Sequence, residues 1–256
     1  MSTGSWIVVT GAASGLGRSL ARAYARRGHR VALIDRNGDG LRETAAALPD
    51  GTDVECRVVD LAETHAAAGA VNALLAELDD VEVLLAVAGL DGPRTSVGEA
   101  GNVAATERVV RVNTLGAVAC VDPAVAHFRR RGAGRLGVVG SVAGLRGLPG
   151  NGYAAYSASK AGIRAYVQSL QAELIRDGLS RRVSATLVLP GHFRSPMTDP
   201  NDKAVIPLER VTRDVVRAVD ARRREVVVSG PMWWLQAAAL RVAPVGIVAR
   251  LDMGAH

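Results

Sequence analysis

The 256-residue chain contains little cysteine, and its two cysteines stand apart from other metal-binding or redox residues. Cys56 and Cys120 lie in apolar or strand-like stretches, with no CxxC pair and no His/Cys cluster beside them. This pattern argues against a disulfide framework and against a zinc site, and we expect no bound metal. Because free cysteines are usually buried, we expect both thiols to lie in the core.

The chain also lacks any linker or leader segment that its composition would reveal. No Pro/Gly/Ser-rich stretch divides it, and 48% of its residues are hydrophobic, so one large α/β domain can bury a sizeable core. The first residues, MSTGSWIVVTG, have no basic n-region and no apolar run long enough for a signal peptide. We therefore expect a compact, cytoplasmic protein.

Lysine is nearly absent: only Lys160 and Lys203 occur among 31 basic residues, and the formal net charge is +6. The densest arginine runs, FRRRGAGR and ARRRE, have no interleaved aromatic residues and match no nucleic-acid motif. Solvated helix ends explain these runs, so we expect no nucleic-acid partner. An attraction to anionic cofactors or membrane surfaces stays open.

Short apolar runs alternate with longer amphipathic stretches along the whole sequence. Continuous apolar runs bounded by Gly, Pro or Asp are typical of strands that are buried on both faces. Alternation with helices indicates a doubly wound, Rossmann-type α/β fold, a seven-stranded parallel sheet with helices on both faces. We expect residues 1–230 to form this single domain. The seven runs are WIVVTG, RVALID, DVECRVVDL, VEVLLAVAG, RLGVVGS, RVSATLVLPG and EVVVSG.

A glycine-rich turn, TGAASGLG at residues 10–17, follows the first of these runs and opens a helix. Glycines allow a tight turn and let the backbone approach a pyrophosphate, whose charge meets the N–H groups of the helix N-terminus. A glycine triplet alone often marks only a tight turn, but this one follows an N-terminal strand. We expect dinucleotide binding here by Gly11, Ser14, Gly15, Leu16 and Gly17.

An acid, Asp35, ends the second apolar run, eighteen residues after Gly17. A carboxylate at this place can accept hydrogen bonds from the adenosine ribose hydroxyls and repels a 2′-phosphate, so it predicts NAD(H). The next residue, Arg36, leaves NADP(H) open, because it could stack on adenine or pair with that phosphate. Asp60 and Leu61 end the third run and are expected to flank the adenine.

The segment YSASK at residues 156–160 places a phenol and an ammonium four positions apart, on one face of a predicted helix. Reduction of a ketone by a nicotinamide needs a proton donor at the substrate oxygen, and the reverse reaction needs a base there. A free tyrosine has a pKa of about 10 and is a weak base, but a nearby cation lowers that pKa. Tyr156 and Lys160 are therefore candidate catalytic residues, although taken alone the pair also fits an exposed helical turn.

Taken together, these motifs resemble the short-chain dehydrogenase/reductase family over roughly residues 6–230. The resemblance is carried by TGxxxGxG at 10–17, Asn113 in RVNTLG, Ser141 in GSVAG, the YSASK segment, and Pro190-Gly191. It implies that Ser141 orients the substrate oxygen, that Asn113 holds a water in a proton relay, and that Lys160 also binds the nicotinamide ribose. It further implies a homodimer or a homotetramer.

Two stretches depart from the family pattern. The family commonly has Asn-Asn-Ala-Gly after its fourth strand, whereas this chain has Ala86-Val87-Ala88-Gly89. Ala88 and Gly89 still permit close approach of the cofactor. In PGHFRSPM, residues 190–197, Phe193 and Ser195 are substituted; we expect Ser195 to contact the carboxamide and the Phe193 ring to narrow the pocket.

Substrate specificity is expected from the loops at about 90–99, 142–152 and 192–210, the last of which we interpret as a lid. The following segment, residues 231–256, is apolar but interrupted by Arg241, Pro244 and Gly246, which argues against a membrane span. We expect it to pack over the substrate mouth or against a second subunit. A membrane-surface contact stays open.

These features predict an alcohol dehydrogenase or carbonyl reductase that transfers a hydride between NAD(H) and a secondary alcohol or ketone, expected to be lipophilic. Asn113, Ser141, Tyr156 and Lys160 form its expected catalytic set. Two alternatives remain: an NADP(H)-dependent ketoreductase with the same site, and a dinucleotide-binding regulatory protein without turnover.

Overall fold

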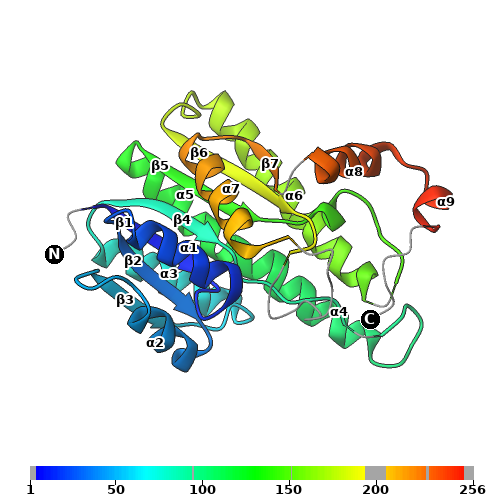
Figure 1. Cartoon of the computed structure of the whole chain (residues 1–256), viewed down its shortest axis with the longest axis horizontal. Helices are drawn as coiled ribbons and strands as arrows, with labels where there is room; N and C mark the ends of the chain where they lie inside the picture. Colours follow the sequence, from blue (N-terminus) through cyan, green and yellow to red (C-terminus); the bar gives the residue numbers. More distant parts are fainter. Residues whose placement is uncertain (1–3, 94, 151, 194–205, 229–230, 251–256) are drawn as a thin grey trace.

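The computed structural model describes residues 4–93, 95–150, 152–193, 206–228 and 231–250. Seven parallel strands form one sheet in the order β3-β2-β1-β4-β5-β6-β7 (Figure 1). The predicted seven-stranded parallel sheet is thereby confirmed. The strands are β1 (Trp6–Thr10), β2 (Arg30–Asp35), β3 (Val54–Val58), β4 (Val81–Ala86), β5 (Gly134–Val139), β6 (Val183–Pro190) and β7 (Glu225–Val228).

Helices cover both faces of the sheet. Side chains of α1, α2 and α7 share one apolar core with the sheet, and those of α3, α5 and α6 share the other. The doubly wound Rossmann-type architecture is therefore confirmed. The α-helices are α1 (Gly15–Ala25), α2 (Gly38–Ala46), α3 (Thr64–Glu77), α4 (Asn102–Val110), α5 (Ala117–Arg131), α6 (Tyr153–Arg176), α7 (Leu208–Asp220), α8 (Pro231–Val242) and α9 (Val245–Val248).

The strand order reverses at β1. This strand pairs with β2 on one side and with β4 on the other, so that Val8 lies between Ala32 and Leu84. Chain connections leave β1 and β4 in opposite directions, which opens a crevice at the carboxyl ends of these two strands. Ligands of doubly wound folds bind in that crevice, and the glycine turn of residues 10–17 lies there.

Strand β3 forms one edge of the sheet, and its residues are half-buried or exposed. Cys56 lies on this strand and is exposed, whereas Cys120 is buried. The prediction of a core thiol is thus confirmed for Cys120 and wrong for Cys56. The physical reason is the strand's place at the edge, where a neighbouring strand covers it on one side only.

A long helical segment runs from Asn102 to Arg131, through α4, a π-helical turn at Arg111–Gly116, and α5. Its length and composition would suffice to cross a membrane, but half of its most apolar window is buried inside the protein. In α5, Cys120, Ala124 and Phe128 belong to the apolar core. Core packing accounts for this hydropathy.

The C-terminal helices α8 and α9 pack near the start of α6. Val248 is buried in a cluster with Ala143 and Leu148, and the partly buried side chains of Leu240 and Tyr156 pack against this cluster. An ion pair between Arg241 and Glu225 ties α8 to β7. This segment also leaves large apolar side chains exposed, among them Trp234, Leu235, Val242, Val245 and Ile247.

Candidate active site

A cavity of about 460 Å³ lies at the carboxyl ends of the central strands. Most of the predicted site residues line this cavity. Asn113 is not among the lining residues, but its neighbour Val112 is. Ser195 falls outside the described residues. The predicted residues that line the cavity are Gly11, Ser14, Gly15, Leu16, Gly17, Asp35, Arg36, Asp60, Leu61, Ala88, Gly89, Ser141, Tyr156, Lys160, Pro190, Gly191 and Phe193.

The glycine turn packs so closely that side chains are excluded. Gly11 has a φ of +69°, and a Cβ on it would lie 2.8 Å from the Ala88 backbone. A Cβ on Gly17 would lie 2.1 Å from the carbonyl oxygen of Gly11. At Gly15 and Gly17, in the first turn of α1, the backbone borders the cavity without a side chain, which fits a pyrophosphate.

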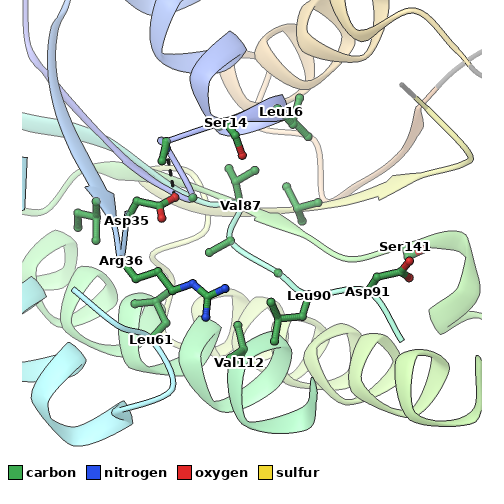
Figure 2. A pocket seen from close by; sticks show the side chains of 18 of the residues that line it. Ser14, Leu16, Asp35, Arg36, Leu61, Val87, Leu90, Asp91, Val112 and Ser141 are labelled. Carbon is green, nitrogen blue, oxygen red and sulfur yellow. Dashed lines mark hydrogen bonds between the residues drawn. The ribbon is translucent and has the colours of Figure 1, made fainter. Parts of the chain in front are cut away.

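The Asp35 carboxylate is held in place by two backbone N–H groups. Its Oδ2 accepts a hydrogen bond from Ala13 N at 3.1 Å, drawn dashed in Figure 2, and its Oδ1 accepts one from Asn37 N at 3.0 Å. Each oxygen keeps a second lone pair. The acid therefore lies ready to accept hydrogen bonds from ligand hydroxyls.

Arg36, next along the chain, is exposed and also lines the cavity. Figure 2 shows its guanidinium near Leu61, Val112 and Leu90. An extended arginine in this position can stack on a flat ring or reach a phosphate. This geometry is compatible with stacking of Arg36 on the adenine and with its pairing to a 2′-phosphate, the two roles that the sequence leaves open.

Two residues that sequence reasoning did not single out hold the turn. The Thr10 hydroxyl accepts hydrogen bonds from Val87 N at 3.1 Å and Ala88 N at 3.3 Å, which joins the ends of β1 and β4. Arg18 donates to the Ala13 carbonyl at 2.6 Å. A signal for Thr10 was present, since it opens the TGxxxGxG motif; nothing in the sequence marked Arg18.

Asn113 lies in the π-helical turn and is buried. Its side chain accepts a hydrogen bond from Leu90 N at 2.6 Å, and its amide donates to the Leu90 carbonyl at 2.9 Å and to Ser159 Oγ at 3.1 Å. The side chain therefore anchors the segment that follows β4. This segment carries Gly89, on which a Cβ would lie 3.3 Å from Lys160 Nζ.

Tyr156 and Lys160 lie one helical turn apart on α6 and face the same cavity. The Lys160 ammonium is 5.7 Å from the centroid of the Tyr156 ring and donates to the Val139 carbonyl at 3.2 Å. Ser141, which follows β5 and accepts from Ala143 N at 3.1 Å, lines the cavity with Tyr156 and lies close enough to lower the pKa of its phenol. Helix α6 and the carboxyl end of β5 thus bring these side chains together.

Burial dominates the proton equilibria of this pair. It raises the pKa of Tyr156 to about 12, although the nearby Ser141 hydroxyl acts in the opposite direction. It lowers the pKa of Lys160 to about 8. The sequence predicted that a nearby cation would lower the tyrosine pKa; in the protein chain alone, loss of water around the phenol outweighs such an effect.

The lowered pKa of Lys160 predicts a pH-dependent stability. Between about 8, its pKa in the folded protein, and 10.5, its ordinary value, the unfolded chain holds a proton that the folded protein does not. The free energy of unfolding should therefore rise with pH, by up to about 3 kcal/mol over the whole window and by about 2 kcal/mol between pH 7 and pH 9.5. Urea unfolding at pH 7 and pH 9.5, without added dinucleotide, measures it. The rise should vanish in Lys160→Met, and an equal rise in that variant would contradict the assignment.

The chain belongs to the short chain dehydrogenase family, whose pattern it matches over residues 5–205. It is 33% identical to an uncharacterized oxidoreductase of Mycobacterium tuberculosis over 92% of this chain and 91% of the relative. It is 37% identical to a 2-dehydro-3-deoxy-L-rhamnonate dehydrogenase (NAD(+)) of a Sphingomonas strain, over 77% of this chain and 75% of the relative.

A solved structure supports the same assignment. A short chain dehydrogenase from Burkholderia cenocepacia, in complex with NADP, superposes with a TM-score of 0.80 at 26% identity, covering 98% of each chain. The predicted family resemblance is confirmed. The protein is therefore an oxidoreductase of this family, and its cofactor is a nicotinamide dinucleotide, NAD or NADP.

Proposed function

We propose that the protein interconverts a secondary alcohol and a ketone, with Tyr156 as the acid/base. The observation that carries the proposal is that Ser141 and Tyr156 line the cavity that the glycine turn borders, close enough for Ser141 to lower the pKa of the phenol. The Lys160 ammonium lies 5.7 Å from the centroid of the Tyr156 ring and lines the same cavity.

The nicotinamide, when bound, supplies or accepts the hydride. The Tyr156 phenol donates its proton to the substrate oxygen during reduction and takes it back during oxidation. With a pKa of about 12, the phenol is protonated at neutral pH, which favours the reducing direction there. Ser141 positions the same oxygen, and the charge of Lys160 stabilises the tyrosinate once it forms.

Apolar side chains near Tyr156 support a lipophilic substrate. Leu148 and Val248 are buried in one cluster, which Tyr153 and Leu240 extend, and Phe193 lines the cavity itself. A screen of secondary alcohols and ketones followed by NADH fluorescence tests the reaction type. Tight dinucleotide binding without turnover of any of them would instead favour the regulatory alternative.

For the cofactor we propose NAD(H). The fixed Asp35 carboxylate suits two ribose hydroxyls and opposes a 2′-phosphate. The name of the Sphingomonas relative, an NAD(+) enzyme, agrees with this proposal. The NADP bound to the Burkholderia protein, together with Arg36, supports the alternative of NADP(H).

The ratio of kcat/KM for NADH and NADPH tests the cofactor. We expect NADH to be preferred, and we expect Arg36→Ala to lower kcat/KM for NADPH several-fold more than for NADH, because the guanidinium can pair with the extra phosphate. Arg42→Ala on α2, whose side chain pairs with Asp39 and does not line the cavity, serves as control. A preference for NADPH of more than about tenfold would overturn the assignment to NAD(H).

A further inference from the structure

One acid lines the substrate side of the cavity without a part in the reaction described above. We propose that Asp91 sets the charge preference of the substrate, so that neutral and cationic alcohols or ketones are accepted and carboxylates are disfavoured. The inference rests on the proposed function, because it concerns the molecule whose oxygen Tyr156 protonates. Asp91 lines the same cavity as Tyr156 and Ser141.

The Asp91 backbone is anchored from the preceding residue. Asn113 binds Leu90 in both directions, accepting from its N–H at 2.6 Å and donating to its carbonyl at 2.9 Å. Asp91 Oδ1 accepts from Gly92 N at 2.8 Å, which orients the carboxylate. The acid is exposed to solvent, yet its backbone is fixed by a buried amide.

The loop is also locked against the start of α6. A Cβ on Gly92 would lie 2.4 Å from the Gly152 carbonyl oxygen, and a Cβ on Gly152 would lie 2.0 Å from the Pro93 carbonyl oxygen. Gly152 N also donates to the Thr95 carbonyl at 3.2 Å. Because Gly152 immediately precedes α6, this contact fixes the distance between Asp91 and the tyrosines of the first turn.

The charge of Asp91 acts on both of those tyrosines. It contributes to the raised pKa of Tyr153 and of Tyr156, in each case after burial. Lys160, the nearby cation, is buried and donates to the Val139 carbonyl at 3.2 Å, whereas Asp91 is exposed.

A second negative charge at this mouth is therefore repelled. Two unit charges about 6 Å apart at a partly wetted surface interact strongly enough to change kcat/KM by roughly tenfold. Salt screens part of that interaction, because the mouth is open to water. The Sphingomonas relative is named for a rhamnonate, which is a carboxylate. Under the inference, carboxylates of this kind are poor substrates of the present chain.

The test uses a charge series on one carbon frame: 4-hydroxycyclohexane bearing a carboxamide, a carboxylate or an aminomethyl group. For the wild type we expect kcat/KM for the carboxamide to exceed that for the carboxylate by about tenfold, with a smaller ratio at high salt. In Asp91→Asn the ratio should fall to about one, and kcat/KM for the aminomethyl compound should fall as well. Asp91→Ser, which keeps an acceptor for Gly92 N, should behave alike.

Asp50→Asn is the matched control, because it removes the same charge from the loop before the edge strand β3, whereas Asp91 follows the carboxyl end of the central strand β4. This control should leave the relative kcat/KM values of the three compounds unchanged. If both Asp91 variants keep the wild-type preference for the carboxamide, the inference about Asp91 is overturned but the proposed function is not. The same holds if the wild type turns over the compounds without preferring the carboxamide. Failure of the wild type to turn over every member, and every compound of the broader screen, would instead overturn the proposed function.

Discussion

Tyr156→Phe is expected to lower kcat in both directions by about 10²- to 10⁴-fold, the range by which a positioned acid or base accelerates proton transfer. The variant keeps the half-buried ring, whose centroid lies 5.7 Å from Lys160 Nζ, and loses only the hydroxyl. Dinucleotide affinity should change little, because the glycine turn and Asp35 are untouched. Steady-state kinetics and NADH fluorescence titration measure the two effects separately.

Tyr153→Phe is the matched control for this experiment. Tyr153 lies on the same turn of α6, is half-buried and responds to the same acid, Asp91. It does not have the four-residue spacing to Lys160, so its loss should change kcat by only a few fold. Activity of Tyr156→Phe within a few fold of the wild type would show that another group moves the proton.

Gly17→Ala is expected to weaken dinucleotide binding by at least about 100-fold and to destabilise the fold by about 1–3 kcal/mol, as overpacking does. The added Cβ would lie 2.1 Å from the Gly11 carbonyl oxygen and 2.6 Å from its carbonyl carbon. Both are backbone atoms, so relief requires the turn itself to move away from α1. Thermal unfolding and NADH fluorescence titration check the prediction.

Gly69→Ala provides the contrast. Gly69 is an exposed residue within α3, and a Cβ there meets nothing within 4 Å. Alanine in a helix interior is favoured over glycine, so this variant should gain about 0.5–1 kcal/mol and bind the dinucleotide normally. Equal behaviour of the two variants would mean that the close packing of Gly17 does not control the turn.

The strands were predictable because each is a short apolar run with turn residues at both ends. The order of the strands within the sheet was not predictable from these runs. It depends on the direction in which each helical crossover connects two strands, and not on the residue pattern within a strand. DVECRVVDL illustrates the difference. It was predicted correctly as a strand, yet it forms the edge, where Arg57 pairs with Glu55 and Glu77 and Cys56 faces solvent.

The site was predictable where its residues keep a fixed spacing, as in the glycine turn and YSASK. Spacing did not give the proton equilibria, because these depend on how completely side chains are removed from water. Lys160 is itself so buried that its pKa falls to about 8. Asp91 follows no motif, and only the packing of Gly92 against Gly152 shows why this acid stays beside the tyrosines.

The π-helical turn at Arg111–Gly116 adds a constraint on chain length. A π turn accommodates one more residue than an α turn, so α4 and α5 differ by about 100° in helical phase. A single deletion there would let the two helices merge into one regular helix, and Phe128 would keep its place in the core. Asn113 would rotate away from Leu90, and with it the anchor of the segment that carries Asp91. The position of Asp91 therefore depends on the one extra residue in the π turn, about twenty positions further along the chain.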